Sequence, residues 1–192
     1  MARARAADPF AHLRRNLAAR PPVRAEESGR RQAAVAVILS PGPRGPEALF
    51  IRRAVRAGDP WSGHVGLPGG GRERADADLY AAAVRETREE VGVALAPESL
   101  LGGLDDLSPS MPGPAPLLIR PFVFGLPERP AAGLSDEVAG LLWLSLAELP
   151  AAAARSVVDI RGDLVEVESY VLGGALIWGL TYRIVRGLLA LL

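Results

Sequence analysis

The chain of 192 residues contains neither cysteine nor lysine. Without cysteine it can form no disulfide and no thiolate zinc site, and its redox compartment cannot be read from composition. All 22 basic residues are therefore arginine, and 22 acidic residues balance them. A net charge of zero gives no general attraction to nucleic acid or to an anionic membrane, so we expect neither as a partner.

Long uninterrupted apolar runs are also missing. The apolar C-terminal stretch, residues 173–192, contains Arg183 and Arg186. Charges at the centre of a bilayer are costly, so this stretch is not expected to span a membrane. Its apolar residues instead predict a helix packed on the core, with a stripe formed by Leu176, Leu180, Ile184 and Leu188. The N-terminus has no hydrophobic signal core, and we expect a cytoplasmic protein.

The length and the apolar share of 49% suit one domain with its own core. We expect an N-terminal helix and linker over residues 1–31 and a domain over residues 32–192. The helix is predicted over residues 9–19, with Asp8 as its N-cap and an apolar stripe formed by Phe10, Leu13 and Leu17. Its arginine and alanine content also resembles a transit peptide, but packing on the domain is the favoured interpretation.

Short strands and a few helices make up the rest of the predicted structure. Residues 33–40 and 47–52 read as a hairpin, and residues 108–116 as a proline-rich loop at the rim of a pocket. Pro121 interrupts a strand at 117–126 and predicts a bulge or a sheet edge there. Further predictions are a strand or turn at 101–107, strands at 136–145 and 164–171, and a short helix at 147–155.

One stretch organises the chain: residues 67–93, LPGGGRERADADLYAAAVRETREEVGV. Its glycine cluster lets the backbone bend sharply and approach a ligand. A helix is predicted over residues 78–91, because alanine, leucine, arginine and glutamate are good helix formers, and Gly92 suits its C-cap. Spacings of three and four residues place Glu86, Glu89 and Glu90 on one helix face.

Three crowded carboxylates repel one another unless a cation neutralises them. Oxygen ligands suit a hard cation such as Mg2+, and the glycine loop could add a carbonyl ligand. Arg85 and Arg88 are placed to orient the carboxylates by paired hydrogen bonds. The alternative is a solvated helix face with Arg–Glu pairs. The glycines on both sides of the helix favour a site.

The run RETREEVGV, residues 85–93, resembles the second half of the Nudix box, G-x5-E-x7-R-E-U-x-E-E-x-G-U with U aliphatic. Thr87 stands where an aliphatic residue is usual. Counting back from Arg85 gives Gly71 as the box glycine, but the acidic position then falls on Ala77. Counting from Gly70 makes Asp76 the acid, with one extra residue before the arginine.

This resemblance implies an α/β Nudix fold, in which a mixed β-sheet is sandwiched between α-helices (α/β/α). It implies a hydrolase that uses Mg2+ or Mn2+ to cleave a small-molecule diphosphate. Glu86, Glu89, Glu90 and the carbonyl of Gly70 would hold the metal, and Arg85 would complete the catalytic set. Gly69 and Gly71 would line the substrate.

The longer box spacing, the DPWSGH loop at residues 59–64 and the IWGLT segment at 177–181 resemble the coenzyme A pyrophosphatase branch. That branch splits coenzyme A into 3′,5′-ADP and 4′-phosphopantetheine. Leu67 departs from its signature, which has phenylalanine there. Alternatives are a Nudix hydrolase for ADP-ribose or a dinucleoside polyphosphate, and a non-catalytic nucleotide-binding module. The protein could be a monomer or a homodimer.

Residues that flank the box are candidates for the substrate pocket. Arg52, Arg53 and Arg56 could bind phosphate by forked hydrogen bonds, or they could be exposed solubilising residues. Trp61 could stack on an adenine or hold its own loop in place, and His64 is expected to fix that loop. Glu137, at the start of a predicted strand, could be an additional acid for the metal site or part of a salt bridge.

Overall fold

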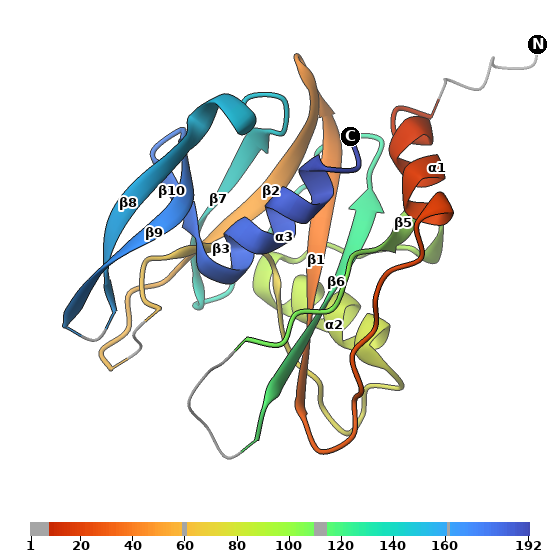
Figure 1. Cartoon of the computed structure of the whole chain (residues 1–192). Helices are drawn as coiled ribbons and strands as arrows, with labels where there is room; N and C mark the ends of the chain where they lie inside the picture. Colours follow the sequence, from red (N-terminus) through yellow and green to blue (C-terminus); the bar gives the residue numbers. More distant parts are fainter. Residues whose placement is uncertain (1–7, 59–60, 110–114, 161) are drawn as a thin grey trace, which may run out of the picture.

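The computed structural model describes residues 8–58, 61–109, 115–160 and 162–192 (Figure 1). It contains three α-helices and two sheets. The helices are α1 (Ala11–Ala19), α2 (Leu79–Val91) and α3 (Gly179–Leu189), and the short 3-10 turns are η1 (Pro97–Ser99) and η2 (Pro150–Ala152). The strands are β1 (Arg31–Gly42), β2 (Gly45–Arg53), β3 (Val65–Gly66), β4 (Gly69–Gly71), β5 (Leu100–Gly103), β6 (Leu117–Gly125), β7 (Val138–Ser145), β8 (Ala153–Ile160), β9 (Asp163–Leu172) and β10 (Ala175–Trp178).

The larger sheet is mixed and is built around β1. Strand β1 pairs parallel with β6 and antiparallel with both β2 and β4. The main order is β3-β2-β1-β6-β5, and β7 extends the sheet by pairing with β2. β4 is the glycine cluster itself, so its pairing with β1 fixes the loop that precedes α2 to the centre of the sheet.

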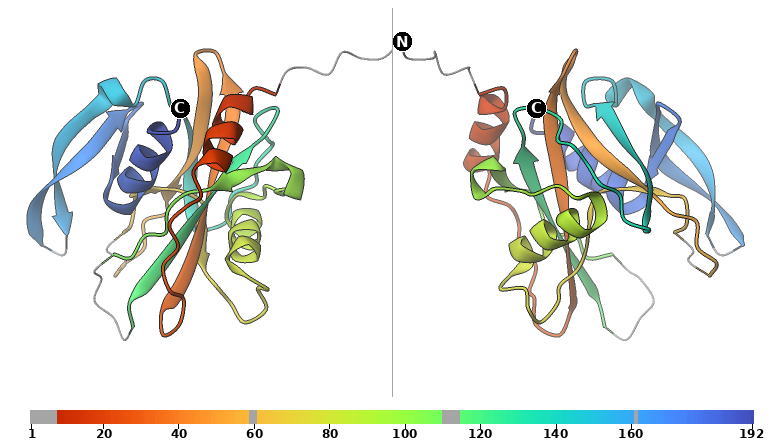
Figure 2. Two further views of the ribbon diagram at one scale, coloured as in Figure 1. Left: turned by 45° about the vertical axis from the view of Figure 1, so that its right-hand side comes forward. Right: turned by 180° about the vertical axis from the view of Figure 1, so that it is seen from behind.

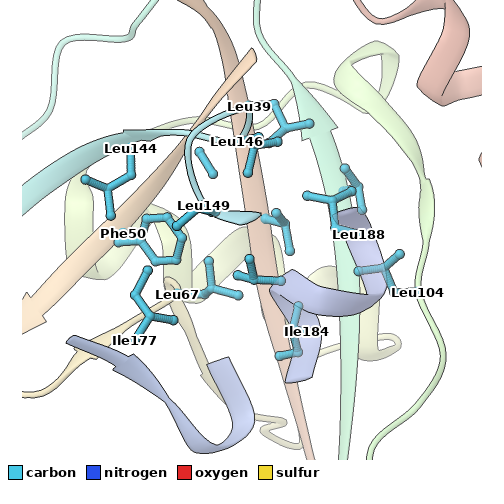
Figure 3. Close-up of a cluster of buried hydrophobic side chains, with 14 of the residues drawn as sticks. Leu39, Phe50, Leu67, Leu104, Leu144, Leu146, Leu149, Ile177, Ile184 and Leu188 are labelled. Carbon is cyan, nitrogen blue, oxygen red and sulfur yellow. The ribbon is translucent and has the colours of Figure 1, made fainter. Parts of the chain in front are cut away.

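The alternation of side chains along β1 creates two apolar faces. Val37 and Leu39 belong to one buried cluster, whereas Ala36 and Ile38 belong to another. α1 and α3 cover the first face, and α2 covers the second (Figure 2). Figure 3 shows the first cluster, which contains Phe50 and Leu144 from the sheet and Ile184 and Leu188 from α3. The α/β/α sandwich expected from the sequence is therefore confirmed.

The N-terminal helix packs on the sheet as predicted. Phe10, Leu13 and Leu17 are buried in the same cluster as the α3 residues. The helix starts two residues later than expected, at Ala11. Asp8 does not occupy the N-cap position, although its carboxylate accepts a hydrogen bond from the Phe10 N–H at 2.9 Å.

Two C-terminal predictions are wrong. Residues 147–155 do not form a helix but a 3-10 turn at Pro150–Ala152, followed by β8. Pairing of β8 with β9 along its whole length outweighs the helix propensity of the alanine run. Residues 173–192 do not form one helix either: Gly173 and Gly174 adopt positive φ and turn the chain into β10, so Leu176 lies in a strand and only the later half is α3.

Pro121 does not mark a sheet edge. It lies in β6, which pairs with β1 through its whole length and with β5 on the other side. The irregularity in register is in β5, between Leu100 and Gly102. The Pro121 carbonyl accepts a hydrogen bond from the Leu104 N–H, just beyond the end of β5. The N–H that proline lacks is therefore not needed for strand pairing there.

Among the described residues, no helix is long and apolar enough to cross a membrane.

Candidate active site

Helix α2 begins at Leu79, one residue later than predicted, and ends at Val91 before Gly92, as predicted. The Asp78 side chain is the N-cap and accepts a hydrogen bond from the Ala81 N–H at 2.8 Å. Gly92 ends the helix in the left-handed conformation with φ of 69°. Thr87, which departs from the usual aliphatic residue, is fully buried, and its hydroxyl donates to the Ala83 carbonyl at 2.8 Å. An internal hydrogen bond therefore makes a polar residue acceptable at this core position.

Arg85 is the centre of the polar network on α2. Its guanidinium donates to both carboxylate oxygens of Asp76 at 3.0 Å, and to Glu86 at 3.0 Å and Glu89 at 2.8 Å. It also donates to the Gly71 carbonyl at 2.9 Å. The forked geometry of arginine makes these bonds possible at once. The structure thus pairs Asp76, rather than Ala77, with Arg85.

Arg88 does not share this role. Its side chain is exposed, and within the described parts of the chain it forms no ion pair. The expectation that Arg88 orients the carboxylates is therefore wrong. Of these two arginines, Arg85 is the one that contacts the glycine loop, through the Gly71 carbonyl.

Glu90 is the most buried of the three glutamates, with 5% of its surface exposed. Its carboxylate accepts a hydrogen bond from the Gly69 N–H at 2.8 Å. Burial raises the pKa of Glu90 to about 7, opposed by the Gly69 hydrogen bond and increased by the charge of Glu86. Burial also raises the pKa of Glu86, although its hydrogen bond from Arg85 acts in the opposite direction.

Two of the three glycines in the loop lie too close to other atoms to carry a side chain unless those atoms move. Gly69 has φ of 144°, and a Cβ there would lie 2.2 Å from the Ala34 carbonyl oxygen. A Cβ on Gly70 would lie 2.6 Å from the carboxyl group of Glu86. The backbone of β4 and the carboxylates of α2 are therefore in direct proximity, at a distance that a larger residue would prevent.

The donors gathered here have the chemistry that Mg2+ and Mn2+ prefer: carboxylate oxygens with backbone carbonyls beside them. Within residues 8–58, 61–109, 115–160 and 162–192, however, no three acidic or histidine side chains converge closely enough to hold an ion as they stand. Arg85 holds one oxygen each of Glu86 and Glu89, and Gly69 holds one of Glu90. The residues therefore fit a divalent cation by donor type.

The three candidate arginines on and after β2 point to different places. Arg52 donates to the carbonyls of Gly63 at 3.5 Å and Gly174 at 3.1 Å. The positive charge of Arg53 partly opposes the rise of the Glu90 pKa. Arg56 is half-exposed and forms an ion pair with Glu137 at 3.1 Å. Arg52 and Arg56 are thus held by other groups of the protein, and a role of the three arginines in substrate binding stays a prediction.

Glu137 has a direct partner and a longer-range influence. Its carboxylate is more than half exposed and pairs with Arg56, as in the salt-bridge alternative. Its charge also raises the pKa of Glu90, so the two carboxylates are within electrostatic range. Either role expected for Glu137 is compatible with this position.

Trp61 and His64 form an aromatic cluster with Trp178 of β10. The ring centroids are 5.9 Å apart for Trp61 and His64, 6.0 Å for Trp61 and Trp178, and 5.2 Å for His64 and Trp178. Asp59 and Pro60, which begin the DPWSGH loop, lie outside the described residues, as do residues 110–114 of the proline-rich loop. Trp178 was not among the predicted site residues, although it lies within the IWGLT segment noted in the sequence.

The sequence matches the family model described as NUDIX domain over residues 29–161, more than half of the chain. A Citrobacter koseri protein named uncharacterized Nudix hydrolase NudL is 34% identical over 174 residues, which cover 88% of this chain and 86% of that protein. Uncharacterized protein C14C4.10c of Schizosaccharomyces pombe is 43% identical over 109 residues. That match covers 54% of this chain and only 33% of the yeast protein.

Among solved structures, the NUDIX domain of Shewanella oneidensis NrtR, crystallised with ADP ribose, is similar with a TM-score of 0.52. It is 18% identical, and the match covers 64% of this chain and 77% of that chain. Likeness at this identity supports the fold alone.

Proposed function

The chain belongs to the Nudix family, and on this premise we propose that it is a divalent-metal-dependent hydrolase that cleaves the diphosphate of coenzyme A or acyl-coenzyme A. The products would be 3′,5′-ADP and 4′-phosphopantetheine. The 4′-phosphopantetheine would carry the acyl group when acyl-coenzyme A is the substrate. The observation that carries the hydrolase part is the arrangement of Glu86, Glu89 and Glu90 beside the glycine loop, held by Arg85 and the Gly69 N–H.

Glu86, Glu89, Glu90 and the Gly70 carbonyl are the groups that would hold a divalent cation. When bound, such an ion neutralises phosphate charge and makes water more acidic. Arg85 fixes the orientation of Glu86 and Glu89, and the Gly69 N–H fixes that of Glu90. Preset groups of this kind contribute to catalysis by position and electrostatics.

The reaction requires one proton acceptor. The oxygen of a water molecule attacks one phosphorus, and the bond from that phosphorus to the bridging oxygen breaks, giving two monophosphates. One of the three glutamates accepts the proton from the water.

The preference for coenzyme A is supported by the contact between two distant segments. The DPWSGH loop and the IWGLT segment each resemble the coenzyme A branch, and Trp61 and His64 of the first meet Trp178 of the second. Arg52 bridges the same two regions through the carbonyls of Gly63 and Gly174. An aromatic surface beside an arginine suits a nucleotide with an adenine ring and phosphate groups.

The test is a product analysis with a panel of diphosphates. Purified protein would be incubated with Mg2+ or Mn2+ and coenzyme A, acyl-coenzyme A, ADP-ribose, NADH or a dinucleoside polyphosphate, and products identified by mass spectrometry. We expect 4′-phosphopantetheine, with coenzyme A or its thioester cleaved fastest. Cleavage of another diphosphate but not coenzyme A would contradict the substrate proposal, and no cleavage with either metal would favour a non-catalytic nucleotide-binding module.

A further inference from the structure

Strand β8 is the outer strand of the small sheet, which has the order β10-β9-β8 (Figures 1 and 2). It pairs antiparallel with β9 from Ala153 to Ile160. Within the described residues, no strand pairs with its other side. Alternate N–H and C=O groups of an outer strand point away from its sheet, where they can pair with another strand.

On the exposed face of β8, the large apolar residue Val157 stands between two opposite charges. Val157 is 64% exposed and lies between Arg155 and Asp159, which share its face because side chains alternate along a strand. Asp159 pairs in register with Leu164 of β9, which is 75% exposed. Such exposed apolar side chains on an open sheet edge favour association with another chain.

We propose that β8 pairs antiparallel with β8 of a second copy of this chain, with Val157 at the twofold axis. In this register residue 155 of one copy lies opposite residue 159 of the other, because the two numbers sum to twice 157. Arg155 of each copy then faces Asp159 of its partner copy on both sides of a Val157–Val157 contact. The two small sheets would become one continuous sheet.

The charges select this register over its neighbours. Directly opposite residues in an antiparallel pair share a face, with their Cβ atoms about 5 Å apart, so opposite charges attract there and like charges repel. A pairing centred on residue 155 would place two Arg155 side chains opposite each other, and one centred on residue 159 would do the same with two Asp159 side chains. Only the centre at Val157 matches both charges on this face.

The existing contacts of these side chains leave room for the new ones. Arg155 pairs with Glu166 at 2.8 Å, but both side chains are more than half exposed, so this pair contributes little. One Asp159 carboxylate oxygen accepts the Gly162 N–H at 2.7 Å. Its second oxygen is therefore the acceptor for Arg155 of the second copy.

The first test is a charge exchange followed by sedimentation velocity over a range of concentrations. Wild-type protein should show a species of twice the 20.2 kDa chain mass at high concentration. Arg155→Asp or Asp159→Arg alone places like charges opposite each other and should raise the dimer dissociation constant at least roughly tenfold. The double variant exchanges the charges and should restore association. Arg44→Asp, which removes an exposed ion pair with Glu148, is the matched control and should leave association unchanged.

The second test reads the register directly and uses the absence of cysteine in the chain. Val157→Cys would place two thiols at the twofold axis, within the Cα separation that a disulfide requires. Arg155→Cys would place them four residues apart in register, too far to join. Under mild oxidation we expect a cross-linked dimer from Val157→Cys only.

Three results would overturn the proposal. Wild-type protein could sediment at 20.2 kDa at every concentration, which would leave β8 to an extended peptide of another protein or to solvent. The double charge variant could fail to restore association. The two cysteine variants could cross-link equally, which would indicate random collision or another interface. Circular dichroism of each variant would establish that the fold is retained.

Discussion

At the scale of single residues, two different groups orient the three glutamates of the site. Arg85 holds Glu86 and Glu89, whereas a backbone N–H from Gly69 holds Glu90. The one glutamate without an arginine partner in this network is also the most buried, and its pKa is raised for that reason. Burial destabilises the charged form of these carboxylates by removing water, and a cation bound beside them would stabilise that form again.

Gly70 provides a test of the close approach between the glycine loop and α2. In Gly70→Ala the new methyl group would lie where the Glu86 carboxyl now is, and this flexible side chain would rotate away at little cost in stability. Misplacement of one catalytic group by about 1 Å can reduce the rate about 100-fold. We therefore expect kcat/KM to fall by about that factor, with an unchanged melting temperature.

The matched control for this variant is Gly66→Ala in β3. A Cβ at Gly66 meets no atom within 4 Å. Steady-state kinetics and thermal melts of both variants would be compared with wild type. Equal activity of Gly70→Ala and Gly66→Ala would show that Glu86 is not needed where the structure places it.

Glu90 predicts a dependence of stability on pH in metal-free protein. Its folded-state pKa of about 7 lies above the ordinary value of 4.5. Between these values the folded state keeps a proton that the unfolded state has lost, so the free energy of unfolding falls as pH rises. The difference amounts to about 3 kcal/mol, since one pKa unit corresponds to about 1.4 kcal/mol.

This dependence would be measured by urea unfolding from pH 4.5 to pH 8 in the presence of a chelator. Glu90→Gln removes the titrating group and should flatten the profile over this range. Identical pH profiles for wild type and Glu90→Gln would contradict the burial of a titrating carboxylate at this position.

At the scale of elements, an ionic clamp fixes the segment between α1 and β1 to the sheet. Asp106, whose side chain is 1% exposed, accepts hydrogen bonds from Arg120 at 2.8 and 2.9 Å and from Arg24 at 2.8 Å. The Ala25 N–H adds a further bond at 3.0 Å. Burial alone would raise the pKa of Asp106, but these donors together lower it.

Asp106→Asn should therefore destabilise the protein strongly. Removing one charge from a buried network leaves its partners uncompensated and costs about 3–5 kcal/mol. The neighbouring Asp105 pairs with Arg20 at an exposed position, so Asp105→Asn should cost about 1 kcal/mol or less. Denaturant unfolding at neutral pH would measure both values. Equal losses for the two variants would contradict the clamp. Because the pKa of Asp106 is lowered in the folded state, the stability that its charge contributes should be lost as pH falls through that pKa.

Elements with a local signal could be predicted from the sequence, whereas β8 and β10, which depend on pairing with β9, could not. Asp78 and Gly92 mark the ends of α2 because capping depends on neighbouring backbone groups. The alanine-rich residues 147–155 carry helix propensity, but β9 is available as a partner and pairs with their last three residues, which begin β8. Likewise, the stripe that includes Leu176 has helical spacing, yet the positive φ angles at Gly173 and Gly174 turn that part into a strand.

At the scale of the whole molecule, the fold brings together segments that the sequence separates. The box residues could be named in advance because their spacing along α2 is local. The partnership of Trp178 with Trp61 and His64 joins positions more than a hundred residues apart, so spacing gave no signal for it. The hydrogen bond from Arg52 to the Gly174 carbonyl likewise joins positions that are far apart in the sequence.

If the α2 glutamates perform the hydrolysis, as we propose, their replacement by glutamine should abolish turnover, and this is the most direct test. Release of 4′-phosphopantetheine from coenzyme A would be measured for wild type, Glu89→Gln, Glu90→Gln and the exposed-loop control Glu128→Gln. We expect Glu89→Gln and Glu90→Gln to lose turnover while retaining the wild-type circular dichroism spectrum, and Glu128→Gln to remain fully active. Full activity in both Glu89→Gln and Glu90→Gln would contradict the assignment of the site.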